Sequence, residues 1–165
     1  MNPVFLQRLL PGLDGTSDVL DSLLENVGID SPIWDFRPDP ERFTLREVVA
    51  HLADYNAIWL DRFVRTKATN RAAFERGDPA QLAIANDYAH ADPRASLSRF
   101  REGRLAIVNL LKTFADEDWA LECIMPAPFG PTTLEYQATF LVVHDSYHTA
   151  QIAQWLALGQ QQHNA

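Results

Sequence analysis

The chain has 165 residues, and a domain of this length buries enough surface to fold without a disulfide or a structural zinc ion. Its 14 basic and 22 acidic side chains give a formal net charge of −8, which repels phosphate backbones and anionic lipids. We therefore predict one domain over residues 1–165 that binds neither nucleic acid nor membranes.

The single cysteine, Cys123, has no partner for an internal disulfide, which suits a reducing compartment. The first residues lack the basic, apolar and small-residue pattern of a secretory leader. No apolar run approaches the roughly 18 residues that a membrane helix needs. These features predict a cytoplasmic protein.

The first long helix is predicted to begin near Thr16 or Ser17 and to end at Gly28, a natural helix stop. Because proline interrupts helix interiors, only a short separate helical piece is expected before Pro11.

A second helix is indicated by Thr44 and Glu47, which have the spacing of a capping box. Apolar residues at helical spacing carry this helix to about Arg65 or Lys67.

A third helix is predicted from Asp92 and Pro93, an N-cap followed by proline at the first helical position, to about Ala115. Gly103 lies inside it and costs about 1 kcal/mol relative to alanine, which predicts a tight packing contact.

The fourth helix is expected to open at Thr132 or Thr133 and to end at Leu158, before Gly159. Residues 77–91 are open to two interpretations, a short helix or an irregular crossover. No segment shows strict polar–apolar alternation, so no sheet is predicted. The fold class is therefore all-α, a four-helix bundle.

Two histidines of the fourth helix, His144 and His148, are four residues apart and project from one face. Leu141 and Ile152 share that face, so it is predicted to be buried. Such a pair either completes its hydrogen bonds within the core or binds a metal ion, because buried polar groups need partners.

A third histidine, His51, lies on the inward stripe of the second helix. Bundle cores often hold metal sites built from facing helices. We therefore predict that His51, His144 and His148 bind a divalent transition metal such as Ni, Zn or Fe, with coordination positions left for water or substrate.

Four polar residues near these histidines each have two interpretations. Asp54 and Asp145 either support the ligand histidines or are solvated surface charges, and the latter is favoured. Gln151 either hydrogen-bonds near the metal or is a surface glutamine. Tyr147 either supplies a phenol or packs between helices, and packing is favoured.

Three further candidates are assigned no chemistry. His90 and His163 are predicted to be exposed. Cys123 is interpreted as a small buried hydrophobe, because no basic residue or histidine adjoins it in sequence.

Several motifs occur in order over residues 30–158: Trp34, Arg37-Pro38, FTLREVVAHLAD with His51, PFGPTTLE, and HDSYHTAQI. Together they resemble the DinB-like (DinB/YfiT) superfamily, whose metal ligands match His51, His144 and His148. The resemblance implies a bundle with up-down-down-up helix order, often dimeric, in which residues 69–92 form a parallel crossover.

The resemblance also implies an activity, because characterised relatives are metal-dependent thiol transferases or isomerases that use mycothiol, bacillithiol or glutathione. The leading hypothesis is a thiol S-transferase that acts on small electrophiles with a low-molecular-weight thiol as cosubstrate. A metal-dependent hydrolase and a non-catalytic, stress-related metal-binding bundle are the alternatives. No catalytic residue beyond the metal ligands is predicted.

Overall fold

The computed structural model describes the backbone of residues 3–163 and the side chains of residues 5–161. Its α-helices are α1 (Pro3–Leu24), α2 (Leu45–Ala68), α3 (Pro79–Ala85), α4 (Pro93–Leu111) and α5 (Leu134–His163). Its strands are β1 (Ala72–Ala73), β2 (Glu122–Met125) and β3 (Gly130–Thr133). Three short 3-10 helices span Pro32–Asp35, Tyr88–His90 and Asp118–Ala120.

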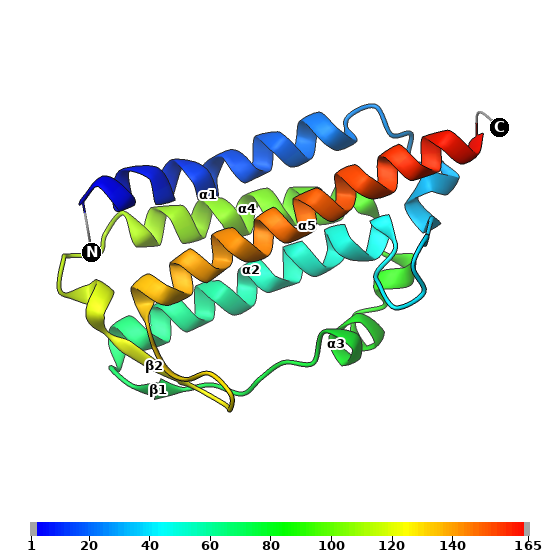
Figure 1. Cartoon of the computed structure of the whole chain (residues 1–165). Helices are drawn as coiled ribbons and strands as arrows, with labels where there is room; N and C mark the ends of the chain where they lie inside the picture. Colours follow the sequence, from blue (N-terminus) through cyan, green and yellow to red (C-terminus); the bar gives the residue numbers. More distant parts are fainter. Residues whose placement is uncertain (1–2, 164–165) are drawn as a thin grey trace.

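The four long helices lie side by side and form the body of the molecule (Figure 1). Near the start of α2, Arg46 donates to the carbonyl of Ala91, just before α4. Near the other end, Lys67 donates to the carbonyl of Thr113, just after α4. Thus α2 and α4 run in the same direction, and the connection over 69–92 returns along the bundle, whereas α1 and α5 run the opposite way (Figure 1).

Two predicted helix starts are confirmed. The hydroxyl of Thr44 accepts from the backbone N–H of Glu47 at 3.2 Å, and the Glu47 carboxylate accepts from the backbone N–H of Thr44 at 2.7 Å. Asp92 accepts from the backbone N–H groups of Arg94 and Ala95 at the start of α4. These contacts satisfy amides that lack partners at a helix N-terminus.

The predicted close contact at Gly103 is also confirmed. A Cβ atom added there would lie 2.9 Å from the Cβ of Asn56 on α2. The amide of Asn56 donates to the carbonyl of Phe100 at 2.8 Å, so it pins α2 to α4 at this point.

The predicted start of α1 is wrong, because the helix is continuous from Pro3 and contains Pro11 in its interior. Leu9 and Leu13, on either side of this proline, are 4% and 0% exposed. Their burial offsets the backbone hydrogen bond that proline removes.

The predicted end of the last helix is wrong as well, since α5 continues through Gly159. A Cβ atom at this position would lie 2.8 Å from the side chain of Ile33. The glycine therefore permits close packing against the first 3-10 helix rather than ending α5.

The mostly helical fold is confirmed, but the absence of a sheet is not. Strand β2 pairs in parallel with β1 and antiparallel with β3, and Cys123 is opposite Ala72 and Thr132. These strands have only two to four residues, too few to show an alternating pattern. Within 77–91 the short-helix interpretation is correct, because α3 lies there.

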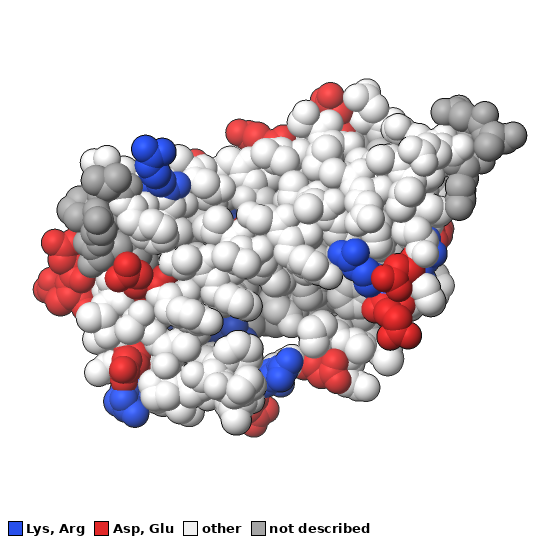
Figure 2. Space-filling view, viewed as in Figure 1, with Lys and Arg blue, Asp and Glu red and all other residues white. Residues whose placement is uncertain are grey.

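The core is built from the inward faces of the long helices, with Trp34, Trp59, Trp119 and Trp155 each at most 2% exposed. None of the described helices has the length and apolar character needed to cross a membrane. On the face shown in Figure 2, the surface over α5 is largely uncharged, and a hollow lies beneath it.

Candidate metal centre

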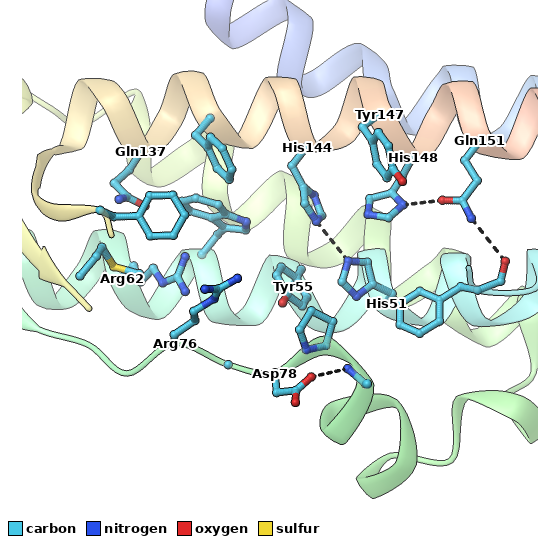
Figure 3. A pocket seen from close by; sticks show the side chains of 18 of the residues that line it. His51, Tyr55, Arg62, Arg76, Asp78, Gln137, His144, Tyr147, His148 and Gln151 are labelled. Carbon is cyan, nitrogen blue, oxygen red and sulfur yellow. Dashed lines mark hydrogen bonds between the residues drawn. The ribbon is translucent and has the colours of Figure 1, made fainter. Parts of the chain in front are cut away.

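The structure brings together the three histidines singled out from the sequence. His51 projects from α2 toward His144 and His148, which lie one turn apart on α5 (Figure 3). The Nε2 atoms of His51 and His144 are 3.1 Å apart. One ring nitrogen from each of the three residues lies within 4.8 Å of the others.

Burial keeps two of these imidazoles neutral. His51 and His148 are 3% and 7% exposed. Loss of solvent, reinforced by the neighbouring histidines, lowers the pKa of His51 from 6.5 to about 2. Loss of solvent and His144 lower the pKa of His148 to about 4. At neutral pH both side chains therefore have a ring nitrogen with a free lone pair, the form that binds metals.

Gln151 fixes the tautomer of His148. The amide nitrogen of Gln151 donates to the carbonyl of Phe43 at 3.3 Å, so its Oε1 atom faces His148. Because this oxygen only accepts, the Nδ1 of His148, 3.1 Å away, carries the proton. The Nε2 lone pair of His148 is thus left free toward the cluster. Of the two interpretations of Gln151, the hydrogen bond near the histidines is correct.

The three imidazoles fit a divalent transition metal. Metal–nitrogen bonds of about 2.0–2.1 Å place two imidazole nitrogens on one ion roughly 2.9–3.4 Å apart. The 3.1 Å separation between the Nε2 atoms of His51 and His144 lies in this range. Without an ion, two facing nitrogen atoms share at most one proton, so the three rings cannot satisfy one another.

The two nearby aspartates lie in different surroundings. Asp145 is 2% exposed and forms a bidentate ion pair with Arg104, so its interpretation as a solvated charge is wrong. Its Oδ1 lies 3.8 Å from the Nδ1 of His144. Asp54 instead pairs with Arg99 at 2.9 Å and accepts from Asn86, away from the histidines.

A pocket of about 570 Å³ lies beside the histidine cluster. Aromatic side chains from α2 and α5 form much of its wall, namely Tyr55, Trp59, Tyr136, Phe140 and Tyr147. The ring of Tyr55 stacks on His144, with centroids 5.1 Å apart. Tyr147 is 55% exposed at the pocket, so the prediction that it packs between helices is wrong.

The remaining candidates are away from this centre or outside the described side chains. His90 is exposed, as predicted, and pairs with Asp87 at 2.7 Å. Cys123 is buried, as predicted for a small hydrophobe. The side chain of His163 lies outside the described residues.

Among the pocket residues that the sequence did not predict are the arginines Arg42, Arg62 and Arg76. Helical periodicity was a usable signal for Arg62, because it lies eleven residues after His51, about three turns along the same face. No local pattern marks Arg76, which belongs to the connection before α3.

A helical bundle with three histidines converging beside a pocket defines a class of candidate metalloprotein. The model of the DinB superfamily matches residues 13–152 of this chain, which therefore belongs to that superfamily.

Among solved structures, the chain is similar to that of YfiT from Bacillus subtilis, with a TM-score of 0.87 and 23% sequence identity. The match covers 94% of this chain and 87% of YfiT, which is described as a probable metal-dependent hydrolase with an unusual four-helix bundle topology. This likeness establishes the fold. A search of curated proteins gave no match.

Proposed function

We propose that the protein is a metal-dependent enzyme whose divalent transition metal, Ni, Zn or Fe, is held by His51, His144 and His148. The observation that carries the proposal is the convergence of three inward imidazoles at the wall of an accessible pocket. When bound, such an ion supplies Lewis acidity, which polarises a substrate and lowers the pKa of a coordinated water or thiol.

The chain's own residues prepare this site for a small-molecule substrate. Gln151 holds His148 in the tautomer whose Nε2 atom faces the cluster. Tyr55 stacks on His144 and makes a tilted ring contact with His51, and it restricts the orientation of both rings. Trp59 and Phe140 form an apolar wall that excludes water from the bound substrate.

Thiol S-transfer to a small electrophile, with a low-molecular-weight thiol as cosubstrate, is the reaction that we propose first. Activation of water for hydrolysis is commonly assisted by a carboxylate general base. Among the described residues that line the pocket, the carboxylates are Glu41 and Asp78. Asp78 is the N-cap of α3, where its Oδ1 accepts from the backbone N–H of Ala80 at 2.9 Å. An ionised thiol needs no such base for its attack.

Hydrolysis is the second candidate. It is supported by the fold shared with YfiT, which is described as a probable metal-dependent hydrolase. A hydrolase would turn over an ester or amide without any thiol. A non-catalytic, stress-related metal-binding protein would hold the ion and show neither reaction.

The test compares both reactions on the metal-loaded protein. Mycothiol, bacillithiol and glutathione are each offered with several electrophiles, and esters and amides are offered without a thiol. Thiol-dependent turnover that is lost on chelation and in His148→Ala, but retained in His90→Ala, supports S-transfer. Thiol-independent turnover with the same dependence supports hydrolysis instead, and turnover insensitive to both changes contradicts the metal-dependent proposal.

We also propose that the protein acts in the cytoplasm as a homodimer. Exposed apolar side chains recur along α5 at helical spacing, namely Tyr136, Phe140, Val143 and Tyr147, and all but Val143 also line the pocket, so this face borders the candidate site. Such a stripe is typical of a helix that packs against a partner. Light scattering over a concentration series should give twice the 18.6 kDa chain mass, and a constant monomer mass would contradict the proposal.

A further inference from the structure

The arginines of this acidic protein differ in whether they form ion pairs. Seven of them form ion pairs with carboxylates: Arg37, Arg46, Arg65, Arg71, Arg99, Arg101 and Arg104. Within the described part of the chain, the three arginines that line the pocket, Arg42, Arg62 and Arg76, have no carboxylate within ion-pair distance. Outside the pocket, Arg8 and Arg94 also lack a carboxylate partner among the described residues, but Arg94 donates to the carbonyls of Leu24 and Val27. The pocket therefore gathers three arginines that are not in ion pairs, beside two carboxylates, Glu41 and Asp78.

Two of these arginines, Arg62 and Arg76, share one end of the pocket. Figure 3 shows their guanidinium groups on the same side of the histidine cluster, near Gln137 and away from Gln151. Arg62 comes from α2 and Arg76 from the connection that crosses the pocket, so the two approach from different elements.

Both guanidinium groups are positioned on aromatic rings, which leaves their N–H groups available. Arg62 lies over the ring of Trp59 at 4.8 Å, and Arg76 lies 5.9 Å from the ring of Phe129. Burial lowers the pKa of Arg62, a cost that a bound anion would offset.

The two carboxylates of the pocket wall do not fill this position. Asp78 is the N-cap of α3, accepts from the backbone N–H of Ala80, and forms no ion pair with Arg62 or Arg76. Glu41 is two residues before Phe43, whose carbonyl binds Gln151, so it belongs to the opposite end of the pocket.

We propose that Arg62 and Arg76 bind an oxyanion of the substrate, a carboxylate or a phosphate ester, while the reactive part of the substrate lies at the histidine cluster. Guanidinium groups present paired N–H donors that match two oxygens of such an anion. Binding of an anion by the two arginines does not depend on the proposed function. Only the statement that this anion is part of the substrate of the metal site rests on it.

The spacing along α2 limits the substrate to a small, elongated molecule. His51 and Arg62 are eleven residues apart, which corresponds to about 16 Å along the helix axis. Helical side chains lean toward the N-terminus, and the longer side chain of Arg62 leans further than that of His51, which shortens the separation between guanidinium and imidazole. The anion and the reactive group are therefore separated by less than this length.

Calorimetric binding to the full chain, with metal removed by chelation, tests the inference. The probes are glutarate, its neutral analogue glutaramide, and inorganic phosphate. The variants are Arg62→Gln and Arg76→Gln, with Arg65→Gln as the matched control. Arg65 is on the same helix but pairs with Asp61 outside the pocket.

We expect an anionic probe, glutarate or phosphate, to bind at least about tenfold more tightly than glutaramide. Each of the variants Arg62→Gln and Arg76→Gln should lower the affinity for that probe about tenfold or more. The control Arg65→Gln should change the affinity of the protein for the same probe by about twofold or less. Tighter binding of glutarate identifies a carboxylate, and tighter binding of phosphate identifies a phosphate ester.

Three results would overturn the inference: no measurable binding of either anion, equal binding of glutaramide, or equal effects of Arg62→Gln and Arg65→Gln. His148→Ala separates this inference from the proposed function. It should lose metal yet keep the affinity of the metal-free protein for the anion. If it keeps its metal instead, the metal proposal fails while the result for the anion stands.

Discussion

Two neighbouring residues of α5, His144 and Asp145, enter two different polar regions of the bundle. Asp145 faces Arg104 of α4, which binds both carboxylate oxygens and also donates to Asn56 at 2.9 Å. His144 faces His51, and their Nε2 atoms lie 3.1 Å apart. In the region around Asp145, each charge is paired with an opposite charge of the chain. In the region around His144, several nitrogen lone pairs lie close together.

Both regions also contain buried nitrogen atoms without a hydrogen-bond partner in the described part of the chain. Within residues 5–161, the Nδ1 atoms of His51 and His144 are buried without a hydrogen-bond partner, and so is the Nε atom of Arg104, whose charge is nevertheless paired with Asp145. Unpaired buried nitrogens therefore occur in both regions and do not distinguish them. The difference lies in the facing groups: Asp145 and Arg104 neutralise each other, whereas the facing Nε2 atoms of His51 and His144 share at most one proton and can accept an ion.

The largest expected effect is the loss of stability of the metal-free protein in acid. The folded-state pKa values of His51 and His148, about 2 and about 4, lie below the unfolded value of 6.5. Between pH 6.5 and 4 the unfolded chain therefore binds protons that the folded chain does not, and the free energy of unfolding falls as pH falls.

Each of these histidines should contribute a slope of about 1.4 kcal/mol per pH unit in that window. Urea denaturation at a series of pH values measures it. His148→Gln should flatten the profile, whereas His90→Gln, at an exposed position, should not. A profile that is the same in all three proteins would contradict the assignment of buried, neutral histidines.

On the other side of α5, Asp145→Asn should leave the charge of Arg104 buried without its partner. Breaking a buried ion pair from one side costs about 3–5 kcal/mol. Asp21→Asn removes a carboxylate from a more exposed pair with Arg101 and should cost no more than about 1 kcal/mol. Equal midpoints of urea denaturation for the two variants would show that the buried ion pair contributes no more to the free energy of unfolding than the exposed one.

A smaller effect is expected from Gln151→Ala, which removes the acceptor that orients His148. Loss of a group that orients a metal ligand typically costs about 10–100-fold in metal affinity. Competition with a chelator of known affinity measures this change. Gln154→Ala, an exposed position on the same helix, is the control. An unchanged metal affinity in Gln151→Ala would mean that the hydrogen bond between Gln151 and His148 does not contribute to metal binding.

The smallest effect concerns Thr44→Ala, which removes one half of the capping box of α2. Such a change costs about 0.5–2 kcal/mol in the free energy of unfolding. Because Thr44 is not among the residues of the pocket, its metal affinity should stay at the wild-type value. A parallel loss of metal affinity would mean that the cluster depends on the helix start.

Local signals in the sequence predicted the parts of the fold that depend on neighbouring residues. The caps at Thr44 and Asp92 are made by side chains that reach only two or three residues along the chain. Likewise, helical periodicity alone puts His144 and His148 on one inward face. Bringing His51 to them required only that α2 pack against α5.

Long-range contacts were beyond such reasoning. The partner of Asp145 is Arg104, 41 residues away, and no local pattern distinguishes this aspartate from a surface charge. Arg76 reaches the pocket only through the path of the long connection, and the parallel pairing of β1 with β2 depends on the same path. Gly159 and Pro11 were misread because packing against distant residues outweighs their local preferences.

The metal content of protein purified without a histidine tag tests the central claim most directly. We expect near-stoichiometric divalent transition metal in the wild-type chain and strong loss in His51→Ala, His144→Ala and His148→Ala. His90→Ala and His163→Ala should retain the wild-type content, which controls for removal of a histidine in general. Equal metal retention in all five variants, after reloading with Zn or Ni, would contradict a centre built on these three residues.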